Sequence, residues 1–129
     1  IELNAQALAV VAGTMANAGI CPLTAETIFH ANHVKNCLSL MASCGMYDFS
    51  GEFAFSIGLP AKSGVSGVLY VVIPNVMGIC IWSPALDPIG NSVRGIDFCN
   101  KLINRFNFHT FDSLVRSSDK KDPRFKPKI

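Results

Sequence analysis

Apolar residues recur at helical intervals in the first third of the chain. Residues 3–17 combine this spacing with strong helix formers, and Asn17-Ala18-Gly19 follows as a typical C-terminal stop. From about Ala31 to Cys44 the apolar positions again fall three or four residues apart, with Gly45 just beyond. The pattern therefore predicts two helices before residue 46.

The same spacing returns near the end of the chain. Gly90-Asn91-Ser92 resembles a helix cap, and the helix it opens is predicted to run to about Phe106. Its apolar stripe consists of Val93, Ile96, Phe98, Cys99, Leu102, Ile103 and Phe106. A short helical turn is expected at about residues 112–116.

Short runs of β-branched and aromatic residues predict strands between these helices. The alternation in Glu52–Ile57 predicts one strand, and Gly67–Ile73 and Val76–Trp82 flank the turn dipeptide Pro74-Asn75 as a buried hairpin. Residues 65–86 are apolar enough to pass a crude test for a membrane span. Because the turn dipeptide interrupts them, we expect the hairpin and no membrane span.

The order of elements indicates the fold class. Two helices, three adjacent strands and one helix, with short connections between the strands, predict an antiparallel sheet flanked by helices. With 129 residues, half of them apolar, the chain has material for one core. We therefore expect an α+β fold in one domain. Since the sequence begins at Ile1 with apolar spacing already established, we interpret it as a fragment of a longer protein.

Charge is concentrated at the end of the chain. The formal net charge is +2, and residues 117–129 alone carry a net +3 from Lys120, Lys121, Arg124, Lys126 and Lys128 against Asp119 and Asp122. The body is close to neutral, which argues against nucleic acid as a partner, because such a partner requires basic residues on the folded surface. We divide the chain into a folded part, 1–116, and a basic flexible tail, 117–129.

The cysteines and histidines do not suggest a metal site or a disulfide framework. The five cysteines are odd in number and form no C-x-x-C pair, which fits reduced thiols in an intracellular protein. His30 and His33 have a spacing usable by a metal, but no third ligand is apparent. We predict neither a metal nor a cofactor.

Lys62-Ser63-Gly64 matches one signature of the serine β-lactamases and penicillin-binding proteins. A glycine in such a motif leaves room for a substrate near the backbone, and a nearby amide can help to form an oxyanion hole. Three residues alone are a weak match. They would also permit a related hydrolase acting on another amide.

Longer strings are more specific, and together they resemble the glutaminase family. They are Ser43–Phe55, Gly58–Val65, Val72–Asn75, Trp82–Asp87 and Gly90–Ser92. The resemblance extends to about Arg124 and is closer to the animal kidney-type and liver-type enzymes than to the bacterial ones. It identifies residues 1–116 as the C-terminal part of a glutaminase catalytic domain.

The resemblance implies a β-lactamase-like fold in which a serine attacks the amide of L-glutamine and forms an acyl-enzyme that water hydrolyses to glutamate. The nucleophile and its lysine belong to a Ser-x-x-Lys motif upstream of this sequence. Matches to that pattern at residues 117–120 and 118–121 lie in the polar tail, downstream of Lys62-Ser63-Gly64, and are attributed to chance.

By the same resemblance, Tyr47 is the proton carrier beside the nucleophile, and the backbone N–H of Val65 helps to hold the oxyanion. A free tyrosine hydroxyl has a pKa of about 10, so its use as a base requires a neighbouring cation, for which the upstream lysine is the candidate. Lys62 and Ser63 are assigned to the substrate pocket, and Gly64 to its backbone geometry.

The resemblance also implies a homo-oligomer, as a dimer or tetramer, a mitochondrial location and inorganic phosphate as an activator. The alternative from another class is an assembly segment without catalytic function. That alternative depends on the predicted helix near residues 92–106 exposing its apolar stripe.

Overall fold

The computed structural model describes residues 1–115 and 119–125. Along the chain its elements are α1 Ala5–Ala16, α2 Ala31–Cys44, the 3-10 turn η1 Tyr47–Phe49, α3 Ser50–Ser56, β1 Ala61–Gly64, β2 Val68–Ile73, β3 Met77–Trp82, α4 Val93–Arg105 and the 3-10 turn η2 Asp112–Leu114. The predicted α+β class, with an antiparallel sheet flanked by helices, is confirmed.

The three strands form one antiparallel sheet in the order β1-β2-β3. The predicted hairpin is β2 and β3, with Ile73 opposite Met77 next to the turn. On the other side of β2, Lys62 lies opposite Tyr70 and Ser63 lies opposite Leu69. Because β1 is the first strand in this order, the motif Lys62-Ser63-Gly64 lies on a strand at the sheet edge.

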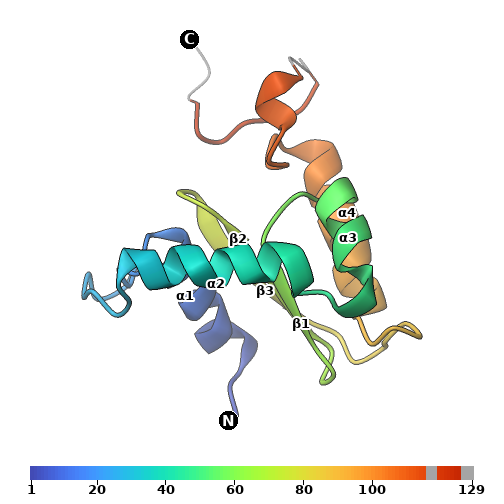
Figure 1. Ribbon diagram of the computed structural model, residues 1–129, viewed down its shortest axis with the longest axis horizontal. Coiled ribbons are helices and arrows are strands. Elements are labelled where there is room, and N and C mark those ends of the chain that lie inside the picture. The colour runs from blue at the N-terminus through green and yellow to red at the C-terminus, as the bar shows by residue number, and fades with distance from the viewer. Residues whose placement is uncertain (116–118, 126–129) are drawn as a thin grey trace.

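Helices cover both faces of the sheet (Figure 1), and each face has its own core cluster. Alternate residues of β2 divide between them, as the two-residue period of a strand requires. Leu69, Val71 and Ile73 pack with residues of α3 and α4. Tyr70 and Val72 pack with residues of α1 and α2. The sheet is therefore the middle layer of three.

The approach of α1 to β3 depends on a glycine. A Cβ built on Gly78 would lie 2.1 Å from the backbone nitrogen of Gly13 and 2.2 Å from the carbonyl carbon of Ala12. No side chain fits at position 78, and the glycine there lets α1 lie directly on β3.

The strand predicted at Glu52–Ile57 is wrong, because these residues form α3 and its C-cap. Phe53 and Ile57, four residues apart, are both buried in the core, while Phe55 between them is exposed. Such burial is characteristic of one helix face and is impossible for a half-buried strand. The third strand of the sheet is instead β1, which directly follows Pro60.

Most of the apolar stripe of α4 faces inward. Cys99 and Ile103 are buried in the core, and Ile96, Leu102 and Phe106 pack against it, which leaves Val93 and Phe98 exposed. The expectation that this helix exposes a usable apolar stripe is therefore wrong. Within the described residues, no helix is long and apolar enough to cross a membrane.

Described residues beyond α4 contact the folded body, at the top of Figure 1. The backbone of Lys121 hydrogen-bonds to Arg105 and to Asn107, both at 2.9 Å. The Lys120 ammonium lies 3.0 Å from the Asp112 carboxylate. Residues 116–118 and 126–129 lie outside the described residues, and with them part of the expected tail and of the two Ser-x-x-Lys matches.

Candidate active site

Tyr47 has a strained backbone at the junction of α2 and α3. It opens the turn η1 with φ of +55°, a left-handed conformation that bulky residues rarely adopt. Such a conformation costs on the order of 1–3 kcal/mol, and it persists only where the surroundings impose it. The contacts around Tyr47 should therefore be numerous.

Ser50 supplies two of these contacts from the first turn of α3. Its buried hydroxyl accepts a hydrogen bond from the Met46 amide at 2.9 Å and donates one to the Tyr47 carbonyl at 2.6 Å. One side chain thus fixes the backbone on both sides of the Met46–Tyr47 peptide. The preceding carbonyl, of Gly45, accepts the Ser63 amide of β1 at 3.0 Å.

The Tyr47 side chain lies against β1 and is 39% exposed. Its hydroxyl donates a hydrogen bond to the Ser63 carbonyl at 3.3 Å. The Lys62 ammonium lies 4.7 Å from the centre of the Tyr47 ring and donates to the same carbonyl. The structure therefore brings together Tyr47, Lys62 and Ser63, with a positive charge beside a hydroxyl that remains partly accessible.

Ser63 contributes its backbone to this cluster, whereas its side chain points inward. The residue is 2% exposed, and no described residue hydrogen-bonds to its Oγ. On the next position, a Cβ built on Gly64 would lie 2.7 Å from Cγ1 of Val68 across the strand pair. A side chain at position 64 would therefore collide with the Val68 side chain, and Gly64 avoids this collision.

Val65 follows at the tip of the turn between β1 and β2. The Gly67 amide donates to the Gly64 carbonyl at 3.0 Å, and Gly67 adopts φ of +90°, which closes the turn. Val65 is 76% exposed, and no acceptor among the described residues takes its backbone N–H. The turn is braced by the Trp82 indole, which donates to the Ser66 carbonyl at 2.9 Å.

A hollow of about 690 Å³ borders this turn. Its lining includes Ser66, Val68 and Trp82 together with residues 1–5 at the beginning of the sequence. Tyr47 and Lys62 do not line this hollow.

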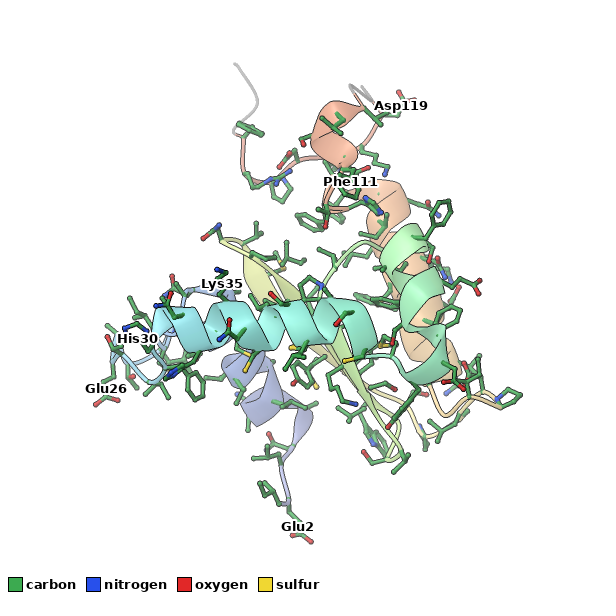
Figure 2. The ribbon with its side chains drawn as sticks, viewed as in Figure 1. Glu2, Glu26, His30, Lys35, Phe111 and Asp119 are labelled. Atoms are coloured by element: carbon green, nitrogen blue, oxygen red, sulfur yellow. The ribbon has the colours of Figure 1, made fainter. Side chains whose placement is uncertain are left out.

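His30 lies at the N-terminal end of α2 (Figure 2), whereas Tyr47 follows the C-terminal end of this helix. His30 caps this helix, with Nδ1 accepting from the Asn32 amide at 3.3 Å, and its ring centre lies 5.6 Å from that of His33. Within the described part of the chain, no group of three His, Cys, Asp or Glu residues could hold a metal ion.

Asn91 belongs to the string Gly90–Ser92, which resembles a helix cap in the sequence, but the structure places it beside Tyr47. Its side-chain amide is fully buried and donates to the Met46 carbonyl at 3.2 Å, next to Tyr47. The true cap of α4 is Ser92, whose Oγ accepts from the Gly95 amide at 3.2 Å. The cap-like string Gly90–Ser92 was a signal for this region, but it did not separate a capping residue from a buried neighbour.

The sequence is similar to one family of known proteins in both a family-model match and pairwise alignments. The glutaminase family model matches residues 1–111. "Putative glutaminase 2" of Caenorhabditis elegans is 58% identical over 125 residues, and the mitochondrial liver isoform of glutaminase from Mus musculus is 56% identical over 124. Each alignment covers 96% of this chain and 21% of the relative, so the chain spans about a fifth of the length of these proteins.

A solved glutaminase structure matches most of this fold. The Bacillus subtilis glutaminase YbgJ, in covalent complex with 5-oxo-L-norleucine, has a TM-score of 0.81 and 32% identity. The match covers 84% of this chain and 39% of that one. The predicted β-lactamase-like architecture is thereby confirmed for the part of it present here. The family match over residues 1–111 and the similarity to these relatives show that the chain belongs to the glutaminase family.

Proposed function

We propose that this chain is the C-terminal part of the catalytic domain of an enzyme that hydrolyses L-glutamine to L-glutamate and ammonia. The observation that carries the proposal is the contact of Tyr47 with β1. A partly exposed hydroxyl lies 3.3 Å from the Ser63 carbonyl, two residues before Val65, whose N–H has no acceptor among the described residues. A proton carrier and an oxyanion donor are the two groups that acyl transfer requires besides a nucleophile.

In the proposed reaction, a serine from outside this sequence attacks the side-chain carbonyl of glutamine. Tyr47 takes the hydroxyl proton and passes it to the departing nitrogen as the C–N bond breaks, which releases ammonia and leaves an acyl-enzyme. Water then attacks the ester: its oxygen bonds to the carbonyl carbon, the bond to the serine oxygen breaks, and Tyr47 passes the water proton to that oxygen as glutamate departs. The negative charge on the carbonyl oxygen in both steps is held by the N–H of Val65.

The covalent complex of the Bacillus subtilis relative supports this chemistry. 5-Oxo-L-norleucine carries a ketone at carbon 5, where glutamine carries its amide, and it is bound covalently to that protein. The complex was formed by reaction with 6-diazo-5-oxo-L-norleucine, whose diazo carbon, next to this ketone, bonds to the nucleophile as N₂ leaves. A nucleophile of that protein therefore lies beside the position that the amide of glutamine would occupy.

Lys62, Ser63 and Gly64 are assigned to the substrate pocket. The Lys62 ammonium, 4.7 Å from the Tyr47 ring centre, supplies positive charge beside the hydroxyl that moves protons. The Ser63 carbonyl orients that hydroxyl. Gly64 keeps the strand free of a side chain where the substrate would approach.

The resemblance to the animal enzymes extends the proposal to assembly and location. We expect a homo-oligomer, a dimer or tetramer, with inorganic phosphate as an activator. A mitochondrial location is supported by the name of the mouse relative, the liver isoform of mitochondrial glutaminase.

The test is glutamate release from L-glutamine by the full-length protein that carries this chain. Tyr47→Phe should lower kcat by about a hundredfold, the effect expected for a general acid–base group. Tyr70→Phe, the same change at the other tyrosine, is the control. Tyr70 lies opposite Lys62, but its ring packs against the cluster of α1 and α2 and the substitution keeps that ring, so kcat should fall far less than in Tyr47→Phe. Thermal unfolding verifies that both variants are folded.

The outcomes separate the alternatives. Turnover of a β-lactam without turnover of glutamine would favour a hydrolase of another amide. Absence of any turnover, together with a concentration-dependent molecular size, would favour a non-catalytic assembly segment. Full activity of Tyr47→Phe would contradict the role of Tyr47 even if glutamine is the substrate.

A further inference from the structure

Asn91 joins two parts of the chain that are 45 positions apart. It precedes α4, is fully buried, and its Nδ2 donates to the Met46 carbonyl at 3.2 Å. The orientation of the amide is determined by this partner, because a carbonyl can only accept a hydrogen bond. The Oδ1 atom, in contrast, is buried without a partner among the described residues.

Asn91 is itself held by a tight loop. Oδ1 of Asp87 accepts the backbone N–H groups of Ile89, Gly90 and Asn91, each at 2.9 Å. The Asp87 amide donates to the Asn91 carbonyl at 2.8 Å, which closes the loop from the other side. The Asn91 amide therefore projects from a fixed platform and not from a mobile connection.

The same loop also meets the Tyr47 ring. Gly90 adopts φ of +102°, and a Cβ built on it would lie 3.7 Å from Cε2 of Tyr47. The loop thus contacts Tyr47 from two directions: Gly90 lies beside its ring, and Asn91 is bonded to the peptide that precedes it.

The Met46 carbonyl is important because the Met46–Tyr47 peptide sets the direction of the Tyr47 side chain. Its other hydrogen bond comes from the Phe49 amide at 3.2 Å, within the local turn η1. That local bond does not tie the turn to the rest of the fold. The bond from Asn91 does, and it holds the left-handed Tyr47 where its hydroxyl reaches β1.

We propose that Asn91 is a positioning residue that acts on the reaction through Tyr47. Asn91 is fully buried and bonded to the Met46 carbonyl, so its effect on the reacting atoms would pass through Tyr47. This inference rests on the proposed function, since it requires Tyr47 to carry protons. Ser50 still holds the backbone on both sides of the Met46–Tyr47 peptide, so loss of the Asn91 amide should shift this peptide and not release it. A shift is sufficient to displace the Tyr47 hydroxyl from the Ser63 carbonyl.

The experiment is a double-mutant cycle on the full-length protein with L-glutamine as substrate. Asn91→Ala should lower kcat by about tenfold or more with little change in KM, because misplacement of a catalytic group by about 1 Å can cost a hundredfold. In the Tyr47→Phe background the same substitution should change kcat by less than about twofold, since its target is already absent.

Asn100→Ala is the matched control. Its Nδ2 also donates to a backbone carbonyl at 3.2 Å, that of Ile96, but on the exposed surface of α4. It should leave kcat unchanged in both backgrounds. Thermal unfolding of every variant separates loss of activity from loss of fold.

Asn91→Asp gives a second readout that does not depend on a cavity variant remaining folded. Its carboxylate has the shape of the amide but cannot donate to the Met46 carbonyl, whereas the protonated acid can. Its activity relative to wild type should therefore rise as pH falls, while the ratio for Asn91→Ala stays constant.

Equal losses of kcat from Asn91→Ala in the wild-type and Tyr47→Phe backgrounds would overturn the inference and leave the proposed function intact. An activity ratio of Asn91→Asp that does not change with pH would also overturn it. Full activity of Tyr47→Phe alone would instead remove the proposed role of Tyr47, and the positioning role would fall with it.

Discussion

Phe53 and Phe55 project from opposite sides of α3. Phe53 is 2% exposed and belongs to the core cluster that joins α3, α4 and the sheet, whereas Phe55 is 87% exposed. The Phe49 ring packs edge-on against Phe53, with the ring centres 6.5 Å apart. Residues two apart on a helix are separated by about 200° around its axis, which accounts for the contrast.

Phe53→Ala should lower the free energy of unfolding by about 3–5 kcal/mol, because it leaves a cavity in the core. Phe55→Ala, the same change two residues away, should alter it by less than about 0.5 kcal/mol. Chemical denaturation of the full-length protein measures both. Similar losses in the two variants would mean that the two rings share one face, as in a strand.

The error at this segment has a physical cause. Phe53, Phe55 and Ile57 alternate with small or polar residues, which fits the period of a strand. Phe53 and Ile57 are also four apart, which fits a helix equally well, and packing against the sheet decides between them. The hairpin and the longer helices were predicted correctly, because there only one period fitted the sequence.

The candidate site also has one part that could be predicted from the sequence and one part that could not. Tyr47 and Lys62-Ser63-Gly64 lie in continuous strings that resemble a known family, so local sequence was sufficient to select them. Asn91 was named in such a string but interpreted as part of a cap, because the contact that places it in the site is with Met46, 45 positions away. A pattern of neighbouring residues contains no information on such a contact, and a polar residue before a helix is interpreted first as a cap.

Gly45→Ala should damage both stability and activity. The backbone of Gly45 is right-handed, so conformation does not forbid alanine, but its Cβ would lie 1.8 Å from the Ala61 carbonyl oxygen. Relieving that overlap requires the segment with Tyr47 to move away from β1. We expect a loss of about 1–3 kcal/mol in unfolding free energy, as for overpacked cores, and a reduced kcat.

Gly51→Ala is the control for this substitution. A Cβ on Gly51 would have nothing within 4 Å, and the residue lies within α3. Alanine there should stabilise the protein by up to about 1 kcal/mol. If Gly45→Ala were as stable and active as Gly51→Ala, the close packing of Gly45 on Ala61 would be contradicted.

The contact of residues 119–125 with the body should weaken in acid. Hydrogen bonds from Arg124, at 2.7 and 2.8 Å, hold the pKa of Asp122 below its ordinary value of 3.8. Arg124 also donates to the Asn107 carbonyl at 2.8 Å. Because the pKa of Asp122 is lowered, the stabilisation from its pair with Arg124 is present above about pH 3.8 and is lost as pH falls through the lowered pKa.

Hydrogen exchange at the Asn107 amide, which donates to the Lys121 carbonyl, measures this contact. Its protection, corrected for the intrinsic rate, should fall in that acidic range, and Asp122→Asn should show low protection at every pH. Asp97→Asn removes an exposed pair with Lys101 on α4 and should change nothing at Asn107. Unchanged protection in Asp122→Asn would show that the ion pair does not hold the segment.

Cys99 should be unreactive in the folded protein. It is fully buried in the core cluster of α4, and burial raises the pKa of its thiol to about 12. Because the thiolate is the nucleophile, alkylation by iodoacetamide at pH 8 should modify Cys99 only after denaturation, while the exposed Cys37 reacts in the native state. Peptide mass spectrometry before and after denaturation distinguishes the two thiols. Equal native labelling of Cys99 and Cys37 would mean that α4 opens readily from the sheet, and the inward orientation of its stripe would be contradicted.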